Sequence, residues 1–207
     1  MITSNSSNNN YIQLDSISKK IQFALFLGYG IMIIQNIAVF TVTNSFQFPL
    51  TLDLIGIFIL ALASVYLGQQ QHINKIRNGG LLLFVWIIIS IIWRSAIGIF
   101  SNKIELGIKV GNTSSGNSNN NTSIAIFLLI IGSFFLGYGI YLISYHLQPF
   151  YNRLRIIVLS YVIVNSVGAI LFLVIIGIFI KILLVPVLGI IMYCLFIIET
   201  RKIPISS

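Results

Sequence analysis

Two charged residues, Asp53 and Arg94, stand inside long apolar segments of this chain. In a membrane-spanning helix such groups are costly and usually pair with one another or face a water-filled cavity. Asp53 lies about four residues into its segment and Arg94 about six from the end of the next, so at ~1.5 Å per residue both sit at a similar depth below one face. This spacing predicts an Asp53–Arg94 ion pair. The alternative is that each side chain extends separately to the headgroups.

Among the uncharged polar residues that interrupt the apolar segments, four are candidates for an intramembrane polar site: Gln35, Asn36, Asn165 and Ser166. Polar side chains at such positions commonly bond to neighbouring helices. The alternative is an intramembrane polar site for a solute.

The hexapeptide FLGYGI occurs at residues 26–31 and again at 135–140. Its Gly-Tyr-Gly core resembles a potassium filter, which is built from four carbonyl-lined loops carrying Thr-Val before this core. Here Phe-Leu precedes the core and both copies lie inside uninterrupted apolar segments, which excludes the filter. Small residues let helices approach closely, so we predict helix packing at four glycines: Gly28, Gly30, Gly137 and Gly139.

Residues for other chemistry are sparse. The two histidines, His72 and His146, lie far apart, and the four acidic residues are scattered. No nucleophile–base pair, phosphate-binding loop or metal-ligand spacing occurs in the sequence. We therefore expect no enzyme activity, no cofactor and no metal site.

The elements that hold these residues must be membrane helices. Of the 207 residues 57% are apolar and only 8% are charged, whereas soluble domains carry about 25% charged residues. The formal charge of +8 comes from basic residues beside apolar segments, which indicates a lipid bilayer rather than nucleic acid as the partner. We predict a polar segment at 1–20, one transmembrane domain at 21–200 and a tail at 201–207. Its six spans are 21–42, 49–68, 80–100, 124–145, 156–178 and 182–198.

The distribution of basic residues predicts the threading. If the helices alternate in direction, eight of the twelve lie on one side: Lys19, Lys20, Lys75, Arg77, Arg153, Arg155, Arg201 and Lys202. The other side has Lys103, Lys109 and Lys181. The sequence therefore predicts an all-α, six-helix bundle in the plasma membrane with both termini cytoplasmic.

The connection at 101–123 contains the run GNTSSGNSNNNTS. Such low-complexity polar sequence predicts a disordered loop on the outer side. Asn112, Asn120 and Asn121 each begin an Asn-x-Ser/Thr triplet, which predicts N-glycosylation. The alternative is that an Asn/Ser-rich loop contains such triplets by chance.

The two FLGYGI copies are spaced 109 residues apart, and the same offset places residues 80–89 over 189–198. A duplication of three helices would explain this spacing and would give a 3+3 inverted repeat, as in many transporters. The alternative is chance similarity between segments rich in Ile and Leu.

The segment GAILFLVIIGIFIKILLVPVLGIIMYCLFII (Gly168–Ile198) and the stretch LIGIFILALA (Leu54–Ala63) carry a family likeness. They resemble a family of small archaeal membrane proteins of unknown function. The resemblance implies a polytopic membrane class and adds no mechanism.

Two functions are consistent with these features. The first is a non-enzymatic structural or accessory role, with other membrane subunits or a second copy as partner. The alternative is a small inverted-repeat transporter of ions or small solutes.

Overall fold

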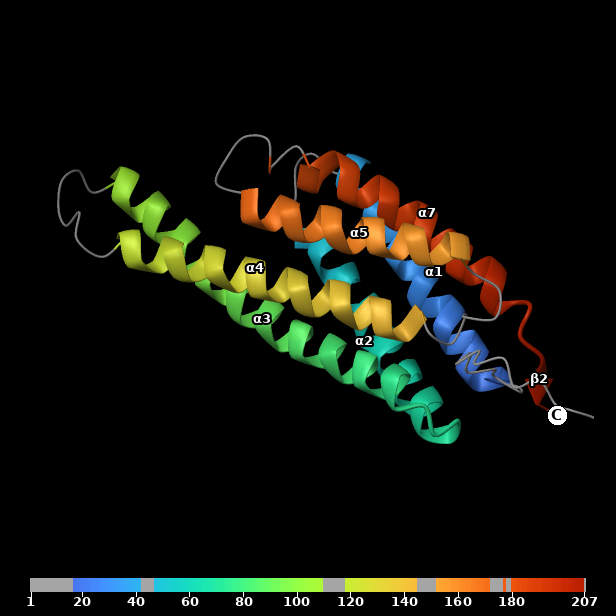
Figure 1. The fold of residues 1–207 in the computed structure, drawn as a ribbon. Coiled ribbons are helices and arrows are strands. Elements are labelled where there is room, and N and C mark those ends of the chain that lie inside the picture. Colours follow the sequence, from blue (N-terminus) through green and yellow to red (C-terminus); the bar gives the residue numbers. More distant parts are fainter. Residues whose placement is uncertain are drawn as a thin grey trace, which may run out of the picture.

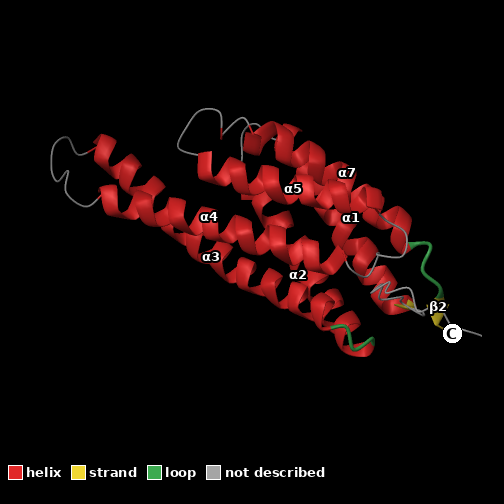
Figure 2. Cartoon of the chain, in the orientation of Figure 1, coloured by secondary structure: helices red, strands yellow, loops and turns green. Residues whose placement is uncertain are grey.

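The computed structural model describes residues 17–41, 47–109, 118–144, 152–171, 177 and 180–206. These residues form an all-α bundle of six helices (Figures 1 and 2), as the sequence predicts. The helices are α1 (Lys19–Thr41), α2 (Gln47–Gln70), α3 (Asn74–Lys109), α4 (Ser118–Ile143), α5 (Asn152–Ile170) and α7 (Val185–Thr200), with the π-helical turn η3 (Ile180–Leu184) leading directly into α7.

Each helix packs beside the one that precedes it in the chain, and α7 packs against both α5 and α1. These contacts close the bundle into a ring. Aromatic packing joins its first and last helices: the ring centroids of Tyr29 and Phe196 lie 5.1 Å apart and those of Tyr29 and Tyr193 lie 6.0 Å apart. All three side chains are buried.

Four helices contain apolar stretches long enough to cross a membrane: Lys19–Val39, Leu52–Gln70, Asn74–Trp93 and Ile180–Thr200. A span needs about 20 residues because each adds ~1.5 Å across a hydrocarbon core of ~30 Å. The apolar stretches described in α4 and α5, Phe127–Ile143 and Arg155–Ile170, are shorter. The protein is thus a helical bundle with the helices of an integral membrane protein.

Both ends of the described chain lie at one end of the bundle, which we call the paired end. Strands β1 (Ile17–Ser18) and β2 (Ile205–Ser206) pair in parallel there, and the backbone N–H of Ile17 donates to the Pro204 carbonyl at 2.8 Å. Because successive helices alternate in direction, α3 and α5 also begin at this end. The basic residues that begin these helices therefore gather on one side of the bundle, as the sequence analysis assumes.

Both ends of the segment 101–123, which the sequence predicts to be a disordered loop, are helical in the structure. Helix α3 continues to Lys109 and α4 already begins at Ser118. The segment SNKIELGIK at 101–109 contains several residues that favour helix, and the low-complexity run starts only at Gly111. Residues 110–117, and with them Asn112, lie outside the described part of the chain.

The last helix also begins earlier than predicted. It starts with the turn η3 at Ile180, not at residue 182, and it ends at Thr200. Pro186 occupies the first turn of α7, where its missing N–H interrupts the hydrogen-bond ladder least. The π turn immediately precedes this proline, so Lys181 is part of a helix and not of a loop.

The first glycine of each FLGYGI copy lies at a helix contact. A Cβ atom added to Gly28 would lie 2.6 Å from Leu60 on α2, and one added to Gly137 would lie 3.0 Å from Val162 on α5. The two glycines therefore occupy corresponding interfaces, α1–α2 and α4–α5.

The rest of the hexapeptide differs between the two copies. A Cβ on Gly139 would lie 3.1 Å from the Gly79 carbonyl oxygen on α3, whereas no described atom lies within 4 Å of one on Gly30. Tyr29 is 1% exposed, whereas Tyr138 is 55% exposed. Helix packing at Gly30 therefore stays a prediction, since no described atom lies beside that position.

Candidate functional site

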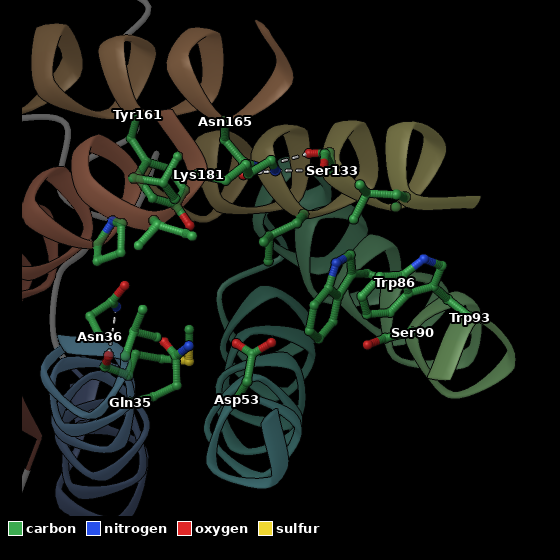
Figure 3. Close-up of a pocket in the computed structure, with 18 of the residues that line it drawn as sticks. Gln35, Asn36, Asp53, Trp86, Ser90, Trp93, Ser133, Tyr161, Asn165 and Lys181 are labelled. Atoms are coloured by element: carbon green, nitrogen blue, oxygen red, sulfur yellow. Dashed lines mark hydrogen bonds between the residues drawn. The ribbon is translucent and has the colours of Figure 1, made fainter. Parts of the chain in front are cut away.

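A cavity of about 390 Å³ lies within the bundle, in the half remote from the paired end (Figure 3). Residues of α1 to α5, η3 and α7 line it. Its polar side chains are Gln35, Asn36, Asp53, Ser90, Ser133, Tyr161, Asn165 and Lys181.

One wall is held together by Lys181, Asn165 and Ser133, which we call the Lys181 cluster. The Lys181 ammonium donates to Asn165 Oδ1 at 2.6 Å and to Ser133 Oγ at 3.0 Å. The Asn165 side-chain amide donates to the Ser133 carbonyl at 3.3 Å. These three bonds join η3, α5 and α4, so a single cation connects three helices beside the cavity.

Lys181 was not among the candidate site residues predicted from the sequence, because it falls between the predicted spans 156–178 and 182–198. Its neighbours in the run IFIKILLV are all apolar, and no Gly, Asn or Ser adjoins it to indicate a turn. Lysine in such a context is a candidate intramembrane charge with a functional role. The apolar residues on both sides of Lys181 are therefore the signal by which the sequence could identify it as part of a span.

Asp53 lies across the cavity from this cluster, on α2, and is half-buried. The predicted Asp53–Arg94 ion pair stays a prediction, because the Arg94 side chain lies outside the described residues. The side chains of the predicted glycosylation positions Asn120 and Asn121 lie outside them as well, although their backbone belongs to α4.

The structure brings together three of the four predicted polar residues. Gln35, Asn36 and Asn165 line the cavity. Asn165 bonds to a neighbouring helix, as expected, whereas the Asn36 amide donates to its own helix at the Met32 carbonyl, 2.7 Å away. Ser166 is buried but does not line this cavity.

Asn36 reaches its place because α7 carries a glycine opposite it. A Cβ atom on Gly189 would lie 3.0 Å from Asn36 Oδ1. The close approach of α7 therefore depends on a missing side chain, and it brings the amide to the wall of the cavity.

Aromatic side chains form another side of the cavity. Trp86 and Trp93 project from α3 (Figure 3), and Tyr161 projects from α5. Trp86 is 8% exposed. A Cβ on Gly132 of α4 would lie 3.3 Å from Ile89 Cγ2 and 3.7 Å from Trp86 Cδ1, so α4 packs against α3 beside the indole ring.

Metal ligation receives no support from the described residues, among which no three His, Cys, Asp or Glu side chains lie close enough to hold an ion. The described lining instead carries one carboxylate, one ammonium group, amides and hydroxyls. Such a set can bind a small polar solute or ordered water.

Comparison of the chain with models of protein families, with curated proteins and with solved structures finds no match.

Proposed function

We propose that this membrane protein binds a small polar solute in the cavity and carries it across the membrane. The convergence of Asp53 and Lys181 on one cavity supports the proposal most directly. Ionisable residues within membrane helices mark substrate and ion pathways, and ligand sites are commonly cavities of ~300–1,000 Å³ with a few convergent polar groups.

The size of the cavity distinguishes this site from polar packing between helices. A side chain that only joins helices needs a partner and no adjacent space. Lys181 has its two described partners, Asn165 and Ser133, and nevertheless borders a cavity of about 390 Å³. The space beside the bonded ammonium favours a bound solute.

An inverted repeat would provide the two alternating states that transport requires. Gly28 and Gly137, related by the offset of 109, support this because they pack at corresponding interfaces. We include the repeat in the proposal, together with a plasma-membrane location and cytoplasmic termini.

The accessory role, which the sequence analysis placed first, becomes the second candidate. Large apolar side chains such as Phe23, Phe58 and Phe127 are exposed on the bundle. Either lipid or a partner subunit can cover such surfaces. The exposed apolar side chains therefore do not favour the accessory role over transport. Neither candidate involves catalysis, and we propose that the protein is not an enzyme.

Purification from its own cells in mild detergent, followed by melting in the presence of amino acids, polyamines, carboxylates or sugars, tests the proposal. We expect the chain to elute alone or as a homo-oligomer, and at least one class of solute to raise its melting temperature. A solute at 100 times its Kd stabilises the folded state by ~2.7 kcal/mol.

Asn165→Leu should abolish this stabilisation. Gln22→Leu is a matched control. The Gln22 amide is also buried and donates to the Thr200 carbonyl at 3.1 Å, but it lies at the paired end, away from the cavity. Stoichiometric partner subunits, combined with no solute effect, would replace the transport proposal with the accessory role.

A further inference from the structure

We infer that the solute passes between the cavity and the paired end along the interface of α1 and α7, and that Tyr29, Tyr193 and Phe196 close this passage. We call these three side chains the aromatic gate. The inference rests on the proposed transport function and adds the path that the solute takes. It follows from the residues along the two facing helices and from how the other helices pack.

One face of each helix runs from the cavity to the paired end, at the spacing of three and four residues that keeps side chains on one side of a helix. On α1 this face carries the buried residues Asn36, Met32, Tyr29, Leu25 and Gln22. On α7 it carries the buried residues Pro186, Gly189, Tyr193, Phe196 and Thr200. Asn36 and Pro186 line the cavity, whereas the Gln22 amide donates to the Thr200 carbonyl at the paired end. The α1–α7 interface therefore connects the cavity with the paired end.

The aromatic gate closes this connection in the structure. The ring centroids of Tyr193 and Phe196 lie 6.2 Å apart, both rings also pack on Tyr29, and none of the three side chains is more than 1% exposed. Tyr193 interacts with Tyr161 of α5, which lines the cavity. The gate thus begins where the cavity ends.

Buried polar atoms lie along the same half of the bundle. The Tyr29 hydroxyl, Ser64 Oγ on α2 and Glu199 Oε2 on α7 have no hydrogen-bond partner among the described residues. Such atoms are rarely left unpaired inside proteins, because the hydration that they lose is costly. A passage that admits water or a polar solute when it opens would give each of them a partner.

Two other interfaces in this half are held by contact with backbone. A Cβ on Gly80 of α3 would lie 2.7 Å from the Ala61 carbonyl oxygen of α2, and one on Gly79 would lie 2.9 Å from the Gly139 carbonyl oxygen of α4. A carbonyl in a packed helix cannot rotate aside, whereas an aromatic side chain can change its rotamer. The π turn η3, followed by Pro186, also supplies a point at which α7 can bend.

A cysteine behind the gate tests this path with a thiol reagent as the probe. Ser64→Cys, in the Cys194→Ser background, replaces a fully buried side chain. Ser64 lies one helical turn closer to the paired end than Leu60, which packs on α1 at Gly28. A membrane-impermeant reagent is added to sealed vesicles from the side on which Asn112→Cys reacts. It must then pass through the cavity and the gate to reach the new thiol.

With the gate intact, Ser64→Cys should react at least about tenfold more slowly than Ser90→Cys in the cavity, because a buried thiol reacts only during local opening. Adding Phe196→Ala should accelerate the reaction of Ser64→Cys at least about tenfold, because opening is then more frequent. Tyr193→Ala is a second variant with the same expected effect. Leu83→Ala is the matched control, since Leu83 is equally buried but packs between α3 and α4, and it should leave the rate unchanged.

Rapid reaction of Ser64→Cys with the gate intact, at the rate of Ser90→Cys, would overturn the inference. This comparison leaves the gate unaltered and remains decisive even if the alanine variants fail to fold. No acceleration by either gate variant, or equal acceleration by Leu83→Ala, would overturn it as well. Each of these results leaves a water-accessible cavity. An unreactive Ser90→Cys, together with no solute effect in the melting screen, would instead remove the proposed function itself.

Discussion

Lys181 is held inside the bundle by two neutral oxygens, one from an amide and one from a hydroxyl. Each of the three residues lies on a different helix, so removing one member should weaken the others. In membranes such hydrogen bonds average ~0.6 kcal/mol and reach ~1.7 kcal/mol. The cluster therefore contributes to stability as well as to the proposed site.

A double-mutant cycle tests this coupling. Lys181→Met and Asn165→Leu should each destabilise the protein, and together they should cost less than the sum, with a coupling of about 0.5–2 kcal/mol. Denaturant titration in mixed micelles measures the free energy of unfolding. Lys181→Met combined with Gln22→Leu, at the far end of the bundle, should be additive. Additivity in the first pair would contradict the cluster.

The last glycines of the two FLGYGI copies should respond differently to the same change. Gly139→Ala places a methyl group against the Gly79 carbonyl, which belongs to the backbone of a packed helix and cannot move aside. Such overpacking costs ~1–3 kcal/mol. Gly30→Ala meets no described neighbour and should be neutral or stabilising by up to ~1 kcal/mol, because alanine favours helix.

Melting of the two variants in detergent makes this comparison directly. Equal melting temperatures for the two variants would mean that α3 and α4 do not approach each other at Gly79 and Gly139.

Residue types alone predicted part of the site. Asp53, expected near one end of its helix, and Asn165, expected among the polar residues inside the spans, both line the cavity. Ser166 follows Asn165 directly, yet it misses the cavity because successive residues point ~100° apart around a helix. Helices that are apolar on all sides give no signal for that rotation, so the sequence could not separate the two.

At the scale of elements, the turn between α2 and α3 shows how a helix end is fixed. The N–H of Ile73 donates to the Gly68 carbonyl at 2.9 Å and that of His72 to the Gln69 carbonyl at 3.3 Å. This pair of bonds is a Schellman motif, which usually has glycine at the left-handed position. Here His72 occupies that position with φ of 55°.

His72→Gly should therefore stabilise the protein by about 1 kcal/mol, because glycine adopts the left-handed conformation without a Cβ clash. Asn78→Gly is a matched control at an exposed position inside α3, where glycine should destabilise by about 0.3 kcal/mol relative to asparagine. Thermal melting measures both changes. Destabilisation by His72→Gly would contradict the left-handed turn.

The helices themselves were largely predictable because long apolar segments have few alternatives in a membrane. The positions at which the helices begin and end were harder to predict. The extension of α3 to Lys109 includes a more polar segment beyond the apolar stretch Asn74–Trp93. The π turn at Ile180–Leu184 has no signature in the sequence beyond the proline that follows it.

At the scale of the whole molecule, six helices in a ring bring the described chain ends together, and β1–β2 pairing joins them. The structure gives the relative arrangement, whereas the side of the membrane comes from the basic residues. The threading is therefore a separate prediction.

Single cysteines introduced in a Cys194→Ser background test the predicted threading of the chain through the membrane. Asn112→Cys, in the connection between α3 and α4, should react with a membrane-impermeant maleimide on intact cells. Gln70→Cys, at the paired end of α2, should react only after permeabilisation. The reverse pattern would place both termini outside.

The central claim is that the cavity is a polar, water-accessible site inside a membrane bundle, and one cysteine measures this most directly. Ser90 lines the cavity, whereas the native Cys194 is exposed on the bundle, where lipid would cover it. In native membranes, Ser90→Cys in the Cys194→Ser background should react with a small water-soluble thiol reagent much faster than Cys194 does in the unaltered chain, because the reactive thiolate forms only with access to water. If Ser90→Cys is as unreactive as Cys194 while Gln70→Cys reacts in permeabilised membranes, the cavity is closed to water and the solute-binding account is contradicted.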